Sequence, residues 1–136
     1  MRKFYQTEWH NIKFSDFYNV DSTELAGKSF YDQFYNKLFS LYSSYDELDS
    51  EWKNRKQYIS DWLADRIDNN AKVLSVGCGL GYVEYRLWLK YDKKIDLTVS
   101  DFSSTSLRWL NKILPADRIY SNNSIYMKNE KFDMIY

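Results

Sequence analysis

Residues 73–81 read VLSVGCGLG, an apolar run that leads into three glycines at alternate positions. A helical pattern begins directly after the last of them, at Tyr82. Because glycine has no Cβ atom, such a backbone can turn sharply and lie against a ligand. Open α/β sheets bind ligands at the carboxyl ends of their strands. The stretch therefore predicts a strand, a ligand-binding loop and a helix, in that order.

The spacing of the glycines argues against two common ligands of such loops, a dinucleotide and a nucleoside triphosphate. A dinucleotide fingerprint reads G-x-G-x-x-G and would need a third glycine at position 82, where the chain has Tyr82. The loop also lacks the lysine and serine of a P-loop, which disfavours hydrolysis of a nucleoside triphosphate. An NAD-binding domain stays open as the weaker alternative.

The segment VLSVGCGLGYVEYRL resembles the first motif of class I S-adenosylmethionine (SAM)-dependent methyltransferases, which commonly reads VLDIGCGTG before a helix. The resemblance covers about residues 71–136. It implies that SAM is the cofactor and that Gly77, Cys78, Gly79 and Gly81 line it. The alternative is a glycine-rich turn that binds nothing.

Three further positions follow from the resemblance. Asp101 comes 24 positions after Gly77, at the end of the next predicted strand, and a carboxylate there would accept both ribose hydroxyls. Phe102 would pack on the adenine ring, and Asn123 would lie near the adenine amino group. Asp101 could also cap a helix that starts near Ser104, and this role is compatible with binding ribose. The segment around Asn123 could instead be a solvated loop.

One position departs from the family pattern. Two residues before the first glycine the family usually has an acidic residue that helps to hold the methionine amino group, whereas this chain has Ser75. A hydroxyl accepts a hydrogen bond but carries no charge, so it would hold the amino group less strongly. A second match lies at the carboxyl end, where KFDMIY (131–136) resembles the "FDxV" strand of the family.

The pattern around the glycine loop predicts the fold class. Short apolar runs at 72–76, 95–100, 118–121 and 132–136 read as strands, and a helix is expected at 82–91. A second helix is expected through Leu107, Leu110 and Leu114. This order predicts an α/β fold with a Rossmann-like parallel sheet of about four strands. Residues 71–136 would thus be a SAM-binding half that stops at the fourth strand.

Residues 1–70 predict a helical N-terminal extension. Phe30, Phe34, Leu38 and Leu41 recur at helical spacing, and a second helix runs from Trp52 to Ile67. Residues 21–23 are candidate caps for the first helix. The extension could form a lid that brings Tyr31 or Tyr35 to the cofactor, or its aromatic residues could simply pack on the sheet. The single histidine, His10, is expected at the surface and not as a catalytic base.

Composition limits the partners. There are 19 basic and 19 acidic residues, so no positive field attracts nucleic acid. No apolar run reaches the length of about 18 residues that suggests a membrane span. A single cysteine and a single histidine argue against a metal site. Because Cys78 alone cannot form an internal disulfide, we expect a reducing cytoplasm, and the N-terminus does not resemble a signal peptide.

The sequence therefore predicts a SAM-dependent methyltransferase whose acceptor is a small molecule, with catalytic residues that the sequence does not identify. The last predicted strand ends at Tyr136, so the family's remaining strands are missing and an apolar sheet edge is exposed. We expect a fragment of a longer protein, or a homo-oligomer in which a second copy covers the edge. A non-catalytic SAM-binding or assembly module is the main alternative function.

Overall fold

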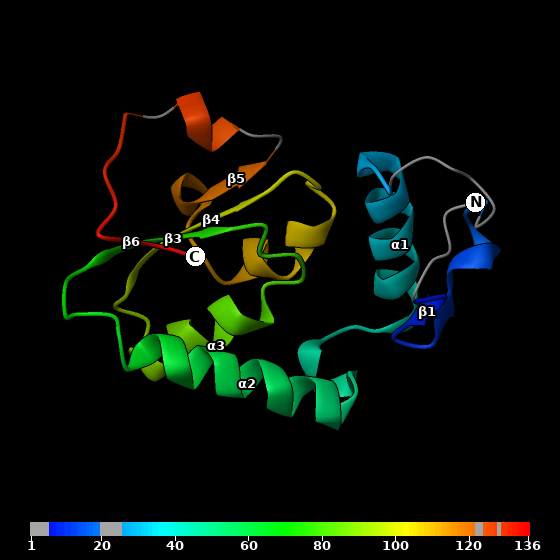
Figure 1. The fold of residues 1–136 in the computed structure, drawn as a ribbon, viewed down its shortest axis with the longest axis horizontal. Coiled ribbons are helices and arrows are strands. Elements are labelled where there is room, and N and C mark those ends of the chain that lie inside the picture. The colour runs from blue at the N-terminus through cyan, green and yellow to red at the C-terminus, as the bar shows by residue number, and fades with distance from the viewer. Residues whose placement is uncertain (1–5, 20–25, 122–123, 128) are drawn as a thin grey trace.

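The computed structural model describes residues 6–19, 26–121, 124–127 and 129–136 (Figure 1). Its centre is a parallel sheet whose strands are ordered β5-β4-β3-β6. Their bounds are Lys72–Val76 (β3), Asp96–Asp101 (β4), Ile119–Ser121 (β5) and Met134–Ile135 (β6). Each neighbouring pair is parallel, so the predicted α/β class with a four-stranded parallel sheet is confirmed, and the architecture is compatible with a Rossmann-like fold.

The two central strands bring the glycine loop beside Asp101. Strands β3 and β4 pair in the register Val73↔Leu97 to Val76↔Ser100, and both are largely buried. The buried positions of β3 are mostly apolar, whereas β4 alternates Leu97 and Val99 with the buried polar residues Thr98 and Ser100. Because the strands run in the same direction, their carboxyl ends, where Gly77 and Asp101 lie, meet at one edge of the sheet.

Two helices pack together below the sheet in Figure 1. Helix α2 (Ser50–Ala64) begins at Asp49, whose side chain accepts a hydrogen bond from the N–H of Trp52 at 2.7 Å. Helix α3 (Tyr82–Lys90) follows the glycine loop directly. The Tyr91 hydroxyl donates to the carbonyl of Ala64 at 3.1 Å, which ties the end of α3 to the end of α2.

The helix predicted through Leu107, Leu110 and Leu114 is wrong. The chain forms short 3-10 turns at Ser106–Arg108 and Leu110–Lys112 instead. The Ser106 hydroxyl donates to the carbonyl of Ser103 at 2.7 Å, and such local side-chain bonds compete with an α-helix. The three leucines are nevertheless buried, so the periodicity identified the buried positions but not the helix type.

The N-terminal part contains strands as well as helices. Strands β1 (Glu8–Trp9) and β2 (Ile12–Lys13) form an antiparallel hairpin. Its two-residue loop, His10 and Asn11, has φ values of 48° and 61°, the left-handed pair of a type I′ turn. This hairpin was not predicted from the sequence.

Helix α1 (Lys28–Leu41) follows the hairpin along the chain, and Figure 1 shows it standing beside the carboxyl end of the sheet. Gly27 precedes α1 and makes no side-chain cap. The predicted caps at positions 21–23 lie outside the described residues. Further 3-10 turns at Phe14–Asp16 and Tyr45–Glu47 flank α1, and others lie at Ala116–Arg118 before β5 and at Ser124–Met127 after it.

The buried apolar residues form two clusters. One lies between the sheet and helices α2 and α3 and contains Val73, Leu87 and Leu97. The other is rich in aromatic residues and joins the hairpin, α1 and the start of α3; Phe34, at its centre, is fully buried. The second cluster therefore packs the N-terminal part against the glycine loop.

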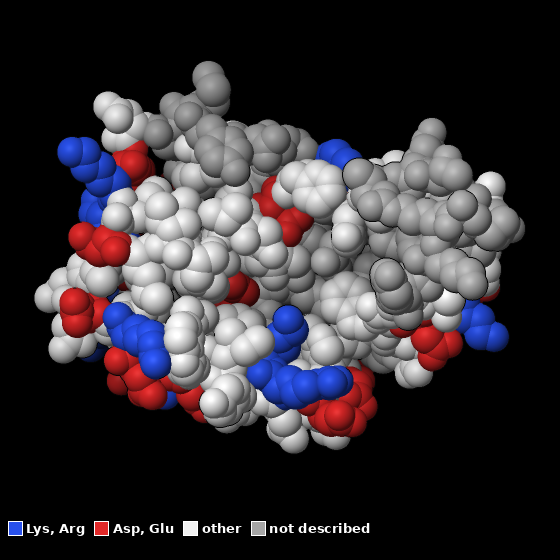
Figure 2. Space-filling view, viewed as in Figure 1, with Lys and Arg blue, Asp and Glu red and all other residues white. Residues whose placement is uncertain are grey.

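On the face drawn in Figure 2, acidic and basic side chains are interspersed, without a large area of one sign. This agrees with the zero net charge of the chain. Among the described residues, no helix is both long and apolar enough to cross a membrane.

Candidate functional site

The glycine loop is fixed to the end of strand β4 by its backbone N–H groups. The N–H groups of Gly77 and Cys78 both donate to the carbonyl of Ser100, at 2.7 and 3.2 Å. The N–H of Gly79 donates to Oδ2 of Asp101 at 2.8 Å. Three consecutive donors of the loop are therefore already used within the protein. Among the described residues, the carbonyl of Gly77 accepts no hydrogen bond and that of Gly79 accepts one from the Cys78 thiol at 3.9 Å, so both carbonyls keep acceptor capacity for a ligand.

One of the three glycines, Gly81, is required by space as well as by conformation. All three have positive φ, at 74°, 57° and 75° for Gly77, Gly79 and Gly81. A Cβ on Gly81 would lie 2.2 Å from Cδ1 of Leu110, and one on Gly79 would lie 3.0 Å from the Tyr35 hydroxyl oxygen. The backbone therefore passes too close to its neighbours to carry a side chain at Gly81.

Asp101 holds this edge of the sheet together. Its side chain is buried, with Oδ2 bound by Gly79 and Oδ1 accepting from the N–H of Ser103 at 2.9 Å. The structure therefore uses Asp101 to fix two loops, and the nearest helical turn after it begins only at Ser106. Each carboxylate oxygen has two lone pairs, so one acceptor site on each oxygen remains for a ligand.

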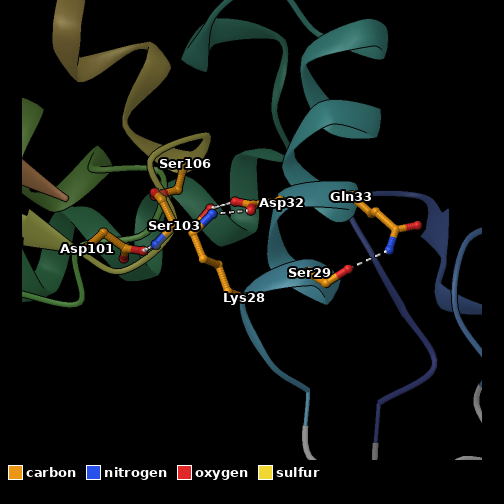
Figure 3. A network of polar contacts seen from close by, with 7 residues as sticks. All are labelled: Lys28, Ser29, Asp32, Gln33, Asp101, Ser103 and Ser106. Atoms are coloured by element: carbon orange, nitrogen blue, oxygen red, sulfur yellow. Dashed lines mark hydrogen bonds and ion pairs between the residues drawn. The ribbon is translucent and has the colours of Figure 1, made fainter. Parts of the chain in front are cut away.

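Helix α1 is tied to the loop after β4, which contains Ser103 (Figure 3). The Ser103 hydroxyl donates to Oδ1 of Asp32 at 2.6 Å, and Lys28 forms an ion pair with the same Asp32 one turn earlier on α1. Burial alone would raise the pKa of Asp32, but the hydrogen bonds from Lys28, Ser103 and Thr105 and the charge of Lys28 together lower this pKa. Arg108 also donates to the side-chain oxygen of Asn36, at 3.2 Å. Helix α1 is thus held over Asp101 by polar contacts at two points.

A cavity of about 430 Å³ lies between the glycine loop and the N-terminal part. Its size falls in the range of small-molecule pockets. The cavity places four of the predicted site residues on one wall: Gly77, Cys78, Gly79 and Gly81. The other walls come from the hairpin, α1 and α2; the described residues there are Gln6, Trp9, Phe14, Ala26, Phe30, Tyr31, Phe34, Tyr35, Trp52 and Lys56.

Two of the remaining predicted residues, Asp101 and Phe102, do not line this cavity. Asp101 nevertheless binds Gly79, which does line it. Phe102 is 39% exposed, and its ring meets the edge of the Tyr31 ring, with centroids 5.5 Å apart. Asn123 lies outside the described residues. The structure therefore brings the glycines and Asp101 together, and connects Phe102 to the cavity only through Tyr31.

A buried polar cluster lies under the loop where the family motif has its acidic residue. The Ser75 hydroxyl donates to Oε1 of Glu84 at 2.6 Å, and the Tyr136 hydroxyl donates to the same oxygen at 3.1 Å. Burial raises the pKa of Glu84, partly offset by the hydrogen bond from Ser75. The sequence analysis missed Glu84, although its position, three residues before the buried Leu87, placed it on the inner face of α3.

Two other titratable groups at the loop are kept neutral. Burial raises the pKa of the Cys78 thiol well above its usual value, and the nearby Glu84 and Asp101 raise it further. Burial and then Asp101 likewise raise the pKa of the Tyr35 hydroxyl. A cysteine nucleophile needs the thiolate form, so Cys78 is suited to contact a ligand and not to attack one.

His10 is partly buried, contrary to the expectation of a surface position. Its ring lies between those of Trp9 and Trp52, with both centroid distances at 4.8 Å. Burial lowers the pKa of His10 to about 4, and Asp49 opposes this shift. The Nε2 atom is buried and finds no hydrogen-bond partner among the described residues.

No group of three or more potential metal ligands occurs among the described residues, and the resemblance requires none. Comparison with known proteins gives no match of the chain to a family model, to a curated protein or to a solved structure.

Proposed function

We propose that this chain carries the SAM-binding part of a SAM-dependent methyltransferase that acts on a small molecule. The observation that supports it best is the link between the glycine loop and Asp101. The loop of three left-handed glycines follows β3, and its middle glycine donates to a carboxylate at the end of the adjacent parallel strand. This arrangement lies at the carboxyl edge of a parallel sheet, where such folds bind ligands.

The hydrogen bonds of the loop favour SAM over NAD. A pyrophosphate would need free backbone N–H groups, but those of Gly77, Cys78 and Gly79 already donate to β4. The methionine part of SAM carries an ammonium group, which needs acceptors, and the carbonyls of Gly77 and Gly79 offer them. Tyr82, which replaces the third glycine of a dinucleotide loop, is already the first residue of α3.

Binding of the adenosine part would involve Asp101 and the helix above it. The free acceptor site on each Asp101 oxygen suits a ribose diol, and Phe102 is exposed enough to take an adenine ring. In this proposal α1 acts as a lid. The contacts Ser103–Asp32 and Arg108–Asn36 hold the lid closed, and these contacts break when the ribose enters. Asn123 keeps its proposed place near the adenine amino group.

When bound, SAM supplies the methyl group together with its own leaving group, a neutral thioether. The protein therefore has to position the acceptor, exclude water and stabilise the sulfonium charge. The rings of Tyr35 and Trp9 line the cavity against the glycine loop, and aromatic faces attract cations. The neutral hydroxyl of Tyr35, adjacent to Gly79, is a donor or acceptor available to the reactants.

Calorimetric titration of the folded chain with SAM, S-adenosylhomocysteine and NAD tests the proposal. We expect binding of the first two and none of NAD. Gly79→Val should abolish binding because its side chain would meet Tyr35 and fill the cavity wall, whereas Ala116→Val, at an exposed turn, should leave binding unchanged. Binding of NAD in preference to SAM would refute the proposal.

A second candidate is a module that binds SAM without transferring its methyl group. One observation favours it: Ser75 donates its hydroxyl to Glu84 instead of presenting a charge to the methionine amino group. A search for radiolabelled methyl transfer to a library of small acceptors distinguishes the two. Transfer by the folded chain would exclude the non-catalytic module.

A further inference from the structure

The cavity beside the glycine loop has walls of an unusual kind. Eight of its described lining residues are aromatic: Trp9, Phe14, Phe30, Tyr31, Phe34, Tyr35, Trp52 and Tyr82. They come from the hairpin, α1, α2 and the start of α3, so the cavity is formed by segments far apart in the chain. A volume of about 430 Å³ remains unfilled between these rings. Flat apolar walls of this kind match a planar aromatic ligand, because rings stack favourably on rings.

One charge lies in these walls. Among the described lining residues, Lys56 is the only charged side chain. It lies one turn after Trp52 on α2, with Nζ 5.9 Å from the centre of the Trp52 ring. Lys56 forms no ion pair with another described residue. The charge of Lys56 slightly offsets the rise in the pKa of the buried Glu84, but the hydrogen bonds to Glu84 come from Ser75 and Tyr136.

We propose that the aromatic cavity binds a planar aromatic carboxylate, with the ring of the ligand against Trp9 and Trp52 and its carboxylate on Lys56. The inference rests on the proposed function to the extent that this ligand would be the methyl acceptor. The binding itself needs no cofactor, so it can be measured separately.

Because Lys56 is the single cation among the described lining residues, the ligand is expected to carry a carboxylate and not a phosphate. A phosphate group carries up to two charges and three acceptor oxygens, and proteins usually meet it with several donors. Here the nearest backbone donors, the N–H groups of Gly77, Cys78 and Gly79, are already bound to β4. One ammonium group with three protons is sufficient for a carboxylate.

The glycine loop forms the opposite wall, so a ligand in this cavity would lie next to the part of the loop that SAM is proposed to occupy. The carbonyls of Gly77 and Gly79 would then hold the cofactor's ammonium group while Lys56 holds the acceptor's carboxylate. The carbonyl oxygens on one wall, which attract a cation, and the Lys56 ammonium group on the other, which attracts an anion, would keep the two ligands in distinct places.

The experiment compares 2-naphthoate with its neutral analogue 2-naphthamide, each titrated calorimetrically into the full chain without SAM. We expect the carboxylate to bind about tenfold more tightly than the amide, the size of one charge-assisted hydrogen bond. Lys56→Gln should remove this preference, and Lys56→Arg should retain most of it. The matched control is Lys37→Gln, which removes the same charge from an exposed position of α1 outside the cavity and should change nothing.

Three outcomes would overturn the inference. The first is no binding of 2-naphthoate to the folded wild-type chain, and the second is a preference for the carboxylate that survives in Lys56→Gln. The third is that Lys56→Gln weakens the binding of SAM but not that of 2-naphthoate or of 5′-methylthioadenosine, which lacks the carboxylate of SAM. Lys56 would then bind the carboxylate of SAM itself. A preference that depends on Lys56 in a chain that fails to bind SAM would support the inference and refute the proposed function.

Discussion

The carboxylate of Asp101 accepts a hydrogen bond from the backbone N–H of Gly79 at 2.8 Å, across the two central strands of the sheet. The same carboxylate accepts from the N–H of Ser103 at 2.9 Å. Asp101 thus joins the loop after β3 to the loop after β4. A residue proposed to bind the cofactor therefore also determines the shape of the loop that binds it.

Asp101→Asn should reduce both stability and affinity. The amide keeps one oxygen but turns an NH₂ group toward one of the two backbone donors, so one charge-assisted hydrogen bond is lost in a buried position. We expect the free energy of unfolding to fall by about 2 kcal/mol. Urea denaturation measures this change, and calorimetry should show SAM binding weakened by about tenfold or more.

Asp117→Asn is the control for this substitution, because Asp117 is exposed in the turn before β5. It should leave both quantities unchanged. Equal affinity of wild type and Asp101→Asn for SAM would show that the carboxylate does not take part in binding.

Gly81→Ala and Gly77→Ala form a matched pair. Both glycines have φ near 75°, so both substitutions place alanine in the left-handed region at a cost of about 1 kcal/mol. Only at Gly81 does the new Cβ meet the buried Leu110 side chain, whereas nothing lies within 4 Å at Gly77. Overpacking adds about 1–3 kcal/mol. Denaturant unfolding should therefore show Gly81→Ala as clearly less stable than Gly77→Ala, and equal losses would contradict the packing described.

The strand, the loop and Asp101 could be predicted from sequence because their signals are local. An apolar run, alternate glycines and a helical pattern follow one another without interruption from Lys72 to Lys90, and the structure has β3 and α3 at these positions. Asp101 ends β4 as its place after an alternating run predicts. Leu107, Leu110 and Leu114 show the limit, since burial follows their spacing while Ser103 and Ser106 redirect the backbone into 3-10 turns.

The residues that sequence analysis missed depend on contacts between distant segments. Glu84 looks like an ordinary charged residue near the start of a helix, and only packing of α3 on β3 and β6 shows that it is buried with Ser75 and Tyr136. Lys56 becomes notable only when the hairpin and α1 bring aromatic rings to it. The hairpin itself depends on a turn whose residues, His10 and Asn11, are not the common Asn-Gly pair.

Glu84 should make stability depend on pH. Because burial raises its pKa in the folded protein above the unfolded value of 4.5, the folded state binds the proton more tightly. Stability is therefore greatest below pH 4.5 for this group and decreases as pH rises through the folded-state pKa. Glu84→Gln is permanently neutral and keeps an acceptor for Ser75 and Tyr136, so it should be more stable than wild type at pH 8.

Urea denaturation at several pH values checks this expectation. The advantage of Glu84→Gln should shrink as pH approaches 4.5, while Glu51→Gln, at an exposed position of α2, should follow the wild-type curve. A Glu84→Gln variant that is less stable than wild type by the same amount at every pH would contradict the raised pKa.

His10 should act in the opposite direction in the acid range. Burial lowers its pKa from 6.5 to about 4, so the unfolded state binds the proton more tightly. Its contribution is constant above pH 6.5, and stability falls as pH decreases from there toward 4. His10→Asn removes the titrating group and keeps a residue that tolerates the left-handed φ of 48°.

The variant loses the ring packed between Trp9 and Trp52, so at pH 7.5 it should be about 1 kcal/mol less stable than wild type. As the pH falls to 5 this difference should narrow and then change sign, because only the wild type is destabilised by protonation of His10 in the unfolded state. Thermal or urea unfolding of both proteins between pH 4 and 7.5 measures the difference directly. A difference that stays constant over this range would show that His10 is solvated enough to keep its ordinary pKa, and that the hairpin does not bury it against α2.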